Sequence, residues 1–330
     1  MASSSSWPFS RARTISTLTT VQHGSAIAFG SFLIVHLAAP AVAVVAPSGE
    51  AVELATKTMI LGRVFYQNAV TELTIVWGAL GLHLASSFAK RVMLALPLHK
   101  RRPSSSKGDE TIQGYSIPEH GPTDASAHPP PPQKRRRKPL SFPSIHTLTG
   151  FILAPAVALH AALNRLVPSR SSAPISDLSP SELDYSYVVH GFQHDSNASW
   201  RAITYGLYAA LLAAGALHVA GGSDKIAKRL QSRRGRRVGN SGNSHSSGSS
   251  STIEVGDSKS SPRAAAKSID VARKAQRKKT ATGAVALLGA GWLGWGIRRM
   301  NRESEGLISS WSAKRFDACY AAIWPYSATR

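Results

Sequence analysis

Five blocks of about 20 residues carry almost no charge, and they limit the fold of this chain more than any other feature. They run over 21–45, 70–89, 146–166, 202–221 and 280–297. Each block is too long and too evenly apolar for a β-strand. About 20 apolar residues, rising 1.5 Å each, cross the ~30 Å hydrocarbon layer of a bilayer. We therefore predict an all-α, polytopic transmembrane helical bundle, since five such blocks in one chain disfavour buried helices of a soluble protein.

The segments between these blocks are rich in Ser, Pro, Lys and Arg, which cannot form a packed core. We predict long disordered loops there, which set the domain organisation. The predicted parts are a tail (1–19), a transmembrane hairpin (20–89), a basic and Pro-rich loop (90–145), a second hairpin (146–222), a basic loop (223–279), and a fifth span with a C-terminal tail (280–330).

The net charge of +21 belongs mainly to two connectors. Residues 90–145 hold 11 basic against 4 acidic residues, and residues 225–279 hold 15 against 3. The other connectors are neutral or acidic, with two of each sign over 46–69 and one basic against four acidic residues over 167–200. Because basic loops stay in the cytosol, we place them and the N-terminus there. Basic residues beside apolar spans indicate membrane lipid as the partner and argue against nucleic acid.

Three arginines do not fit this orientation. Arg298, Arg299 and Arg302 follow the fifth block and would lie on the far side of the membrane. Either the fifth block is re-entrant or peripheral, or the positive-inside rule is weak in the membrane that holds this chain.

The N-terminal tail is rich in Ser, carries Arg11 and Arg13, and contains no acidic residue. This composition is typical of a mitochondrial targeting segment, and a short disordered tail is the alternative. The single cysteine, Cys319, excludes an intrachain disulfide and a Cys-based metal cluster.

The chain contains an internal repeat marked by histidines. The first and third blocks each open with a histidine and place a second one 13 or 14 residues later, and the second and fourth blocks each carry one histidine near their ends. The six matched histidines are His23, His36 and His83 in the first half, and His146, His160 and His218 in the second. Such a repeat predicts two related helical hairpins about a pseudo-symmetry axis.

The rise of 1.5 Å per residue sorts these histidines by depth. His23, His83, His146 and His218 should form one layer near the cytosolic face, and His36 and His160 a second layer roughly 20 Å deeper. An imidazole in hydrocarbon needs a partner, so these residues are candidate functional groups. Interhelical hydrogen bonding, haem b and another metal are the three interpretations.

Other motifs are weaker. Gly289, Gly291 and Gly294 satisfy GxGxxG, but they lie inside an apolar span, where small residues favour close helix packing over dinucleotide binding. His190 and His194 flank Asp195 in a loop without a nucleophile beside them. With no nucleophile–base pair in the sequence, we expect a protein that is not an enzyme.

The first and third blocks read HGSAIAFGSFLIVHLAAP and HTLTGFILAPAVALHAALNR. With their hairpins they resemble a fungal family of multi-span adaptors of the mitochondrial outer membrane, which recruit a Vps-type bridge-like lipid-transfer protein to mitochondria–vacuole contacts. The same helices resemble the cytochrome-b-like membrane anchor of succinate dehydrogenase, in which histidines hold haem. The resemblance covers about residues 20–222.

The first resemblance implies an outer-membrane adaptor of lipid homeostasis whose partner is a bridge-like lipid-transfer protein. Such adaptors use a short proline-containing cytosolic peptide, and the nearest candidate here is Pro130 with Pro132. A plain spacer is the alternative for this stretch. The second resemblance implies haem held by the histidines, and so an electron-transfer subunit. A transporter built on the repeat is a third hypothesis.

Overall fold

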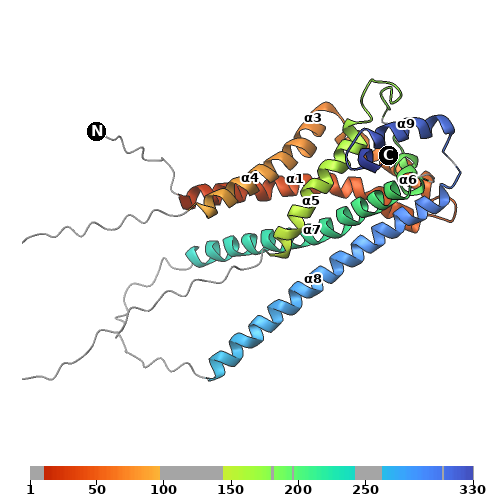
Figure 1. Cartoon of the computed structure of the whole chain (residues 1–330). Coiled ribbons are helices and arrows are strands. Elements are labelled where there is room, and N and C mark those ends of the chain that lie inside the picture. The colour runs from red at the N-terminus through yellow and green to blue at the C-terminus, as the bar shows by residue number, and fades with distance from the viewer. Residues whose placement is uncertain are drawn as a thin grey trace, which may run out of the picture.

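The structure is a computed structural model, shown in Figure 1, that describes residues 11–96, 144–179, 182–194, 197–241, 262–306 and 308–329. Pro130, Pro132 and most residues of the two predicted disordered loops lie outside the described residues. The longer elements are α1 (Arg11–Val45), α2 (Ala51–Tyr66), α4 (Ala79–Ala95), α5 (Ile145–Ala161), α6 (Tyr185–Gln193), α7 (Ala198–Ser241), α8 (Pro262–Glu303) and α9 (Ser310–Ala321). Shorter turns are α3 (Ala69–Thr71), the π-helical η1 (Glu72–Gly78) and η2 (Ala162–Leu166), and the 3₁₀ turn η3 (Tyr326–Thr329).

The prediction of an all-α polytopic fold is confirmed over the described residues, which contain helices and turns. Five helical stretches are long and apolar enough to cross a membrane: Arg11–Val45, Ala69–Ala95, Ile145–Leu166, Ala198–Ser232 and Thr280–Glu303. Their large apolar side chains point outward, as at Ile34 (76% exposed), Phe88 (70%) and Leu288 (74%). Side chains of this kind on an outer surface fit a hydrocarbon solvent and not water.

The spans form two antiparallel pairs joined by the fifth. α4 packs against α1, and α7 packs against α5, so each half is a helical hairpin. α8 packs against both α1 and α7. In Figure 1 it meets the bundle towards its C-terminal end and diverges from it towards its N-terminal end. A direct ion pair also joins the halves, because Arg165 Nε and Nη2 donate to the two carboxylate oxygens of Glu72 at 2.8 and 3.0 Å.

The glycines of the fifth span differ in what they contact. A Cβ on Gly296 would lie 2.0 Å from the carbonyl oxygen of Pro40, so α8 meets α1 backbone to backbone there. Gly294 meets a side chain of α7, whereas nothing lies within 4 Å of a Cβ built on Gly289 or Gly291. Close packing by small residues therefore applies to the end of the glycine-rich stretch, and most strongly to Gly296, which lies outside the GxGxxG pattern.

The segments outside the five apolar blocks contain more helix than we predicted. α7 continues to Ser241 and α8 begins at Pro262, so much of 223–279 is helix. α1 already begins at Arg11, which shortens the predicted tail. The near-neutral connector 46–69 holds α2, which packs along α1 with Gly62 against Val35. Charge and hydropathy averages did not reveal these helices because helical propensity, and not apolar content, extends them.

A small cap covers the far end of the bundle, opposite the N-terminal end of α1 (Figure 1). It combines the loop 167–183, α6, the start of α7, α9 and η3 around aromatic side chains. Its buried core is Leu163, Val167, Ile175, Leu178, Leu183, Tyr187, Trp200, Phe316, Cys319, Tyr320 and Tyr326. Two hydrogen bonds tie its ends together: Tyr187 Oη donates to the Leu163 carbonyl, and Trp200 Nε1 to the Tyr326 carbonyl.

Arg299, one of the three arginines that do not fit the positive-inside rule, has hydrogen-bond partners at the end of α1. Its guanidinium donates to the carbonyls of Val44, Ala46 and Pro47 at 2.8–3.0 Å and lies 3.1 Å from Glu303. A helix C-terminus leaves carbonyls unpaired and carries partial negative charge, so a cation is stabilising there. This arginine therefore has a structural role at the end of α1.

Candidate functional site

The centre of the site is a pair of histidines from facing spans of the second hairpin. His146 Nδ1 lies 3.1 Å from the carbonyl oxygen of His218, and His218 Nδ1 lies 3.1 Å from the carbonyl oxygen of His146. Each Nδ1 therefore carries the proton that it donates to the other residue's backbone. The two rings stack with centroids 4.1 Å apart. Both imidazoles are half-buried and partnered, as a polar group in a membrane interior requires.

Two glycines make this close approach feasible. A Cβ on Gly150 would lie 3.0 Å from Cε1 of His218, and a Cβ on Gly221 would lie 3.1 Å from Cβ of His146. Each glycine follows a histidine of the pair by three or four residues, so it lies on the same helix face. Each of the two helices, α5 and α7, thus supplies one histidine of the pair and a glycine against which the histidine of the other helix packs.

A third histidine joins this layer from the first hairpin. The ring of His83 meets the ring of His218 edge to face, with centroids 6.1 Å apart. His83 Nδ1 lies 3.2 Å from the carbonyl of Gln22, and the Gln22 side chain bonds Ser87 and Lys90. His83, His146 and His218 therefore lie at one depth, as the helical rise predicted. His23 follows Gln22 in α1, beside this layer.

The second predicted layer is also present. The rings of His36 and His160 meet edge to face with centroids 6.0 Å apart, joining α1 to α5. His160 bonds the side chain of Asn164, one turn further along. His36 stacks on Phe32, and its Nδ1 is buried without a hydrogen-bond partner. These contacts bring the two hairpins together at a second depth.

The residues of the two layers differ in how they suit haem. His146 and His218 stack face to face at 4.1 Å, which leaves no space for a flat macrocycle between them. His36 and His160 meet edge to face at 6.0 Å, and His83 and His218 do so at 6.1 Å, so ring spacing does not separate these two pairs. His36 differs in that its Nδ1 is buried without a hydrogen-bond partner. Haem binding by any of the six histidines remains a prediction.

Sequence reasoning located the histidines and missed their partners. Gln22, Gly150 and Gly221 could have been found, because each lies beside or one turn away from a repeated histidine. A second cluster was found only in part: the sequence singled out His190 and His194 but not Asp317, which they face. Asp195, which lies beside them in the sequence, is outside the described residues.

The comparison with protein families bears on the second half of the chain. Residues 155–302 match the model of a family described as MDM10-complementing protein 1, transmembrane domain. The match supports a mitochondrial membrane protein. It begins within α5 and ends within α8, so it includes α7 and the fifth span and covers a little under half of the chain.

No curated protein matches the chain, and no solved structure matches it. The resemblance to the succinate dehydrogenase anchor therefore stays a prediction from the sequence.

Proposed function

We propose that this chain is a non-enzymatic, multi-span protein of the mitochondrial outer membrane that acts in lipid homeostasis as an adaptor at contacts with another organelle. The observation that carries the proposal is the match of residues 155–302 to the transmembrane domain of MDM10-complementing protein 1. The matched region holds His160, His218 and the fifth span, so the resemblance concerns the second hairpin and α8.

The charge at one end of the bundle supports a cytosolic, lipid-facing surface. Lys90 and Arg91 end the second span, and Lys225, Lys228 and Arg229 follow the fourth. Lys90 bonds Gln22 and Arg229 bonds Thr20, so these basic residues gather around the start of α1. Anionic headgroups attract each such residue by about 1 kcal/mol.

The connector between the second and third spans is the part of the chain that supplies the adaptor peptide in this proposal. It leaves from the basic end and returns to it, since Lys90 and His146 both lie there. Pro130 and Pro132 belong to its run of four prolines, 129–132, and proline-rich sequences are a recognised class of docking peptide. The proposed partner is a bridge-like lipid-transfer protein.

Fractionation with protease protection tests the location. Protein in intact mitochondria should lose the 97–143 connector to external protease while the spans and the cap stay protected. Recovery of the protein in the plasma membrane or the secretory pathway would sink the proposal.

Co-purification tests the partner. Changing Pro130 and Pro132 to Ala should abolish recovery of the lipid-transfer protein, whereas Pro118→Ala in the same connector should leave it unchanged. Equal recovery of the lipid-transfer protein by both variants would show that this peptide does not bind it, and the adaptor role would then require another binding segment.

A haem-binding electron-transfer subunit is the second candidate. His36 favours it, because its Nδ1 is buried without a hydrogen-bond partner and its ring contacts that of His160 on another span. Detergent-solubilised protein should then show a Soret band that His36→Ala and His160→Ala each abolish and that His146→Ala retains. A colourless protein after expression with added haem precursor would exclude this function.

A further inference from the structure

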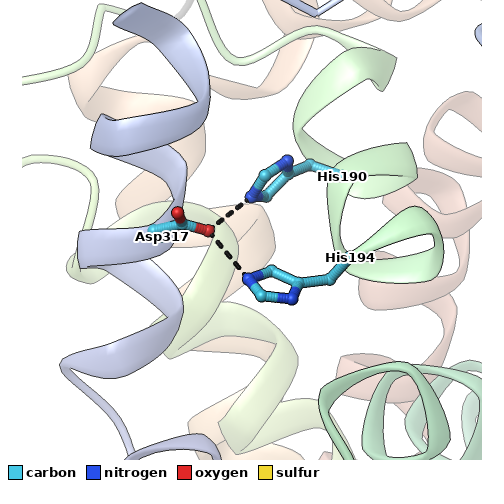
Figure 2. Close-up of side chains that lie close together, drawn as sticks. All are labelled: His190, His194 and Asp317. Atoms are coloured by element: carbon cyan, nitrogen blue, oxygen red, sulfur yellow. Dashed lines mark hydrogen bonds and ion pairs between the residues drawn. The ribbon is translucent and has the colours of Figure 1, made fainter. Parts of the chain in front are cut away.

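Two histidines and an aspartate converge in the cap, away from the histidine layers of the bundle. His190 Nε2 lies 2.7 Å and His194 Nε2 lies 3.1 Å from the same oxygen of Asp317, as Figure 2 shows. The ligand atoms of all three lie within 4.8 Å of one another. His190 lies in α6 and His194 directly follows it, so a spacing of four residues puts both on one side, and Asp317 comes from α9.

The surroundings hold these three groups in place. A Cβ on Gly191 would lie 2.4 Å from the hydroxyl of Tyr320, so α9 rests directly on α6 beside His190. On the other side of Asp317, Arg315 donates to the carbonyl of Ile175 at 2.9 Å and to Glu182 at 2.5 Å. Both flanks of Asp317 are thus anchored, which fixes its carboxylate opposite the imidazoles.

Burial differs across the cluster in a way that suits a bound cation. The two imidazoles are 12% exposed, with Phe316 against His190 and Trp200 against His194. The carboxylate of Asp317 is 43% exposed. Apolar walls exclude competing water from the nitrogens, while the open carboxylate side gives an ion a path of entry.

The donor chemistry selects the ion. Two imidazoles and one carboxylate with an open fourth position are a common donor set for Zn²⁺, which binds nitrogen and oxygen at about 2.0–2.2 Å in tetrahedral geometry. Ligand atoms in such a site lie roughly 3.3 Å apart. The two Nε2 atoms lie 2.7 and 3.1 Å from the carboxylate oxygen, and all three ligand atoms lie within 4.8 Å of one another, so side-chain shifts on the order of 1 Å would admit the ion. A harder cation such as Ca²⁺ or Mg²⁺ prefers six or more oxygen ligands.

We propose that His190, His194 and Asp317 form a zinc site that fastens α9 to α6. Zn²⁺ takes the place of the Nε2 protons that bond the carboxylate, each neutral ring then carries its proton on Nδ1, and water completes the coordination. The ion then links the C-terminal segment to the loop between the third and fourth spans. This site is independent of the histidine layers and of the adaptor role.

The test uses the full chain in detergent with a tag that contains no histidine, after removal of metal by a chelator. Titration with Zn²⁺ should give one strong site, and Co²⁺ should give the intense visible absorption of four-coordinate geometry. His190→Ala, His194→Ala and Asp317→Asn should each weaken Zn²⁺ binding by at least about 100-fold, since even outer-shell changes cost 10–100-fold. Asp177→Asn, in the same cap, should bind as the unchanged chain does.

Thermal unfolding gives a second measurement. Zn²⁺ should raise the melting temperature of the unchanged chain and of Asp177→Asn, but not that of Asp317→Asn. Should the histidine variants fail to fold, X-ray absorption on the unchanged chain with one equivalent of Zn²⁺ should report two imidazole ligands. Equal affinity of the unchanged chain and Asp317→Asn, or a zinc spectrum without imidazole, would overturn the site and leave hydrogen bonds only.

Discussion

His146 and His218 exchange hydrogen bonds, each Nδ1 donating to the carbonyl of the other residue across the α5–α7 interface. Such an exchange satisfies both imidazoles and two helix carbonyls at once. It also aligns the two helices in register, because a shift of either one along its axis breaks both bonds. The polar pair therefore helps to set the register of the second hairpin, together with the close packing at Gly150 and Gly221.

Substitutions at the glycines that receive these rings should loosen the hairpin. Gly221→Val would place side-chain atoms against Cβ of His146, which cannot move without the helix, and overpacking of this kind costs about 1–3 kcal/mol. Gly206→Val is the matched control, because nothing lies within 4 Å of a Cβ at that position of the same helix. Denaturation in detergent, followed by circular dichroism, measures both. Equal losses would mean that the histidine does not rest on Gly221.

The fifth span offers a second matched pair of glycines. Gly296→Ala would put a methyl group 2.0 Å from the carbonyl oxygen of Pro40 and should push α8 away from α1, at a cost of about 2 kcal/mol or more. Gly291→Ala, five residues earlier, meets nothing and should leave the free energy of unfolding unchanged or slightly higher. Crosslinking between cysteines introduced on α1 and α8 should report the separation. A Gly296 variant that crosslinks as efficiently as Gly291→Ala would contradict the contact.

Arg299 should matter more than its neighbour Arg302. Arg299→Ala leaves the carbonyls of Val44, Ala46 and Pro47 without their donor and should lower the free energy of unfolding by about 1–3 kcal/mol. Arg302 is exposed, and its change to Ala should stay within about 0.5 kcal/mol. Neither change should invert the chain. Reversed protease accessibility in Arg299→Ala would show that this charge sets topology after all.

The ion pair between the hairpins should be worth more than an exposed one. Glu72→Gln removes the carboxylate that accepts two bonds from Arg165, and we expect a loss of about 1–3 kcal/mol, since Glu72 is only 16% exposed. Glu53→Gln breaks the exposed pair with Lys57 and should cost less than about 1 kcal/mol. The same denaturation measurement decides between them, and losses of similar size would assign Glu72 no linking role.

Particular residues show which features of the structure can be predicted from the sequence. A bilayer fixes span length, and a constant rise fixes depth, so the five spans and the layers of His83 with His218 and of His36 with His160 follow from spacing alone. The structure of the cap cannot be predicted from residue spacing. Asp317 lies 123 residues beyond His194, in a short helix, and only folding brings the two together. From the sequence, Arg299 is interpreted as a charge that sets membrane orientation, because its contact with the end of α1 appears only in the structure.

The thiol of Cys319 provides a last test, of the cap. It is fully buried, and burial raises its pKa from the ordinary 9.0 to about 11, because the thiolate loses water. A group with a raised folded-state pKa stabilises the fold below its unfolded pKa, so this contribution should be complete below pH 9 and be lost as pH rises from 9 to about 11. At pH 8 the thiolate fraction should be about 100-fold lower than in the unfolded chain, and maleimide labelling correspondingly slow. Because the chain has a single cysteine, mass spectrometry gives the rate directly, with labelling in SDS as the reference. Rapid, stoichiometric labelling of the folded protein at pH 8 would mean that the cap does not enclose Cys319.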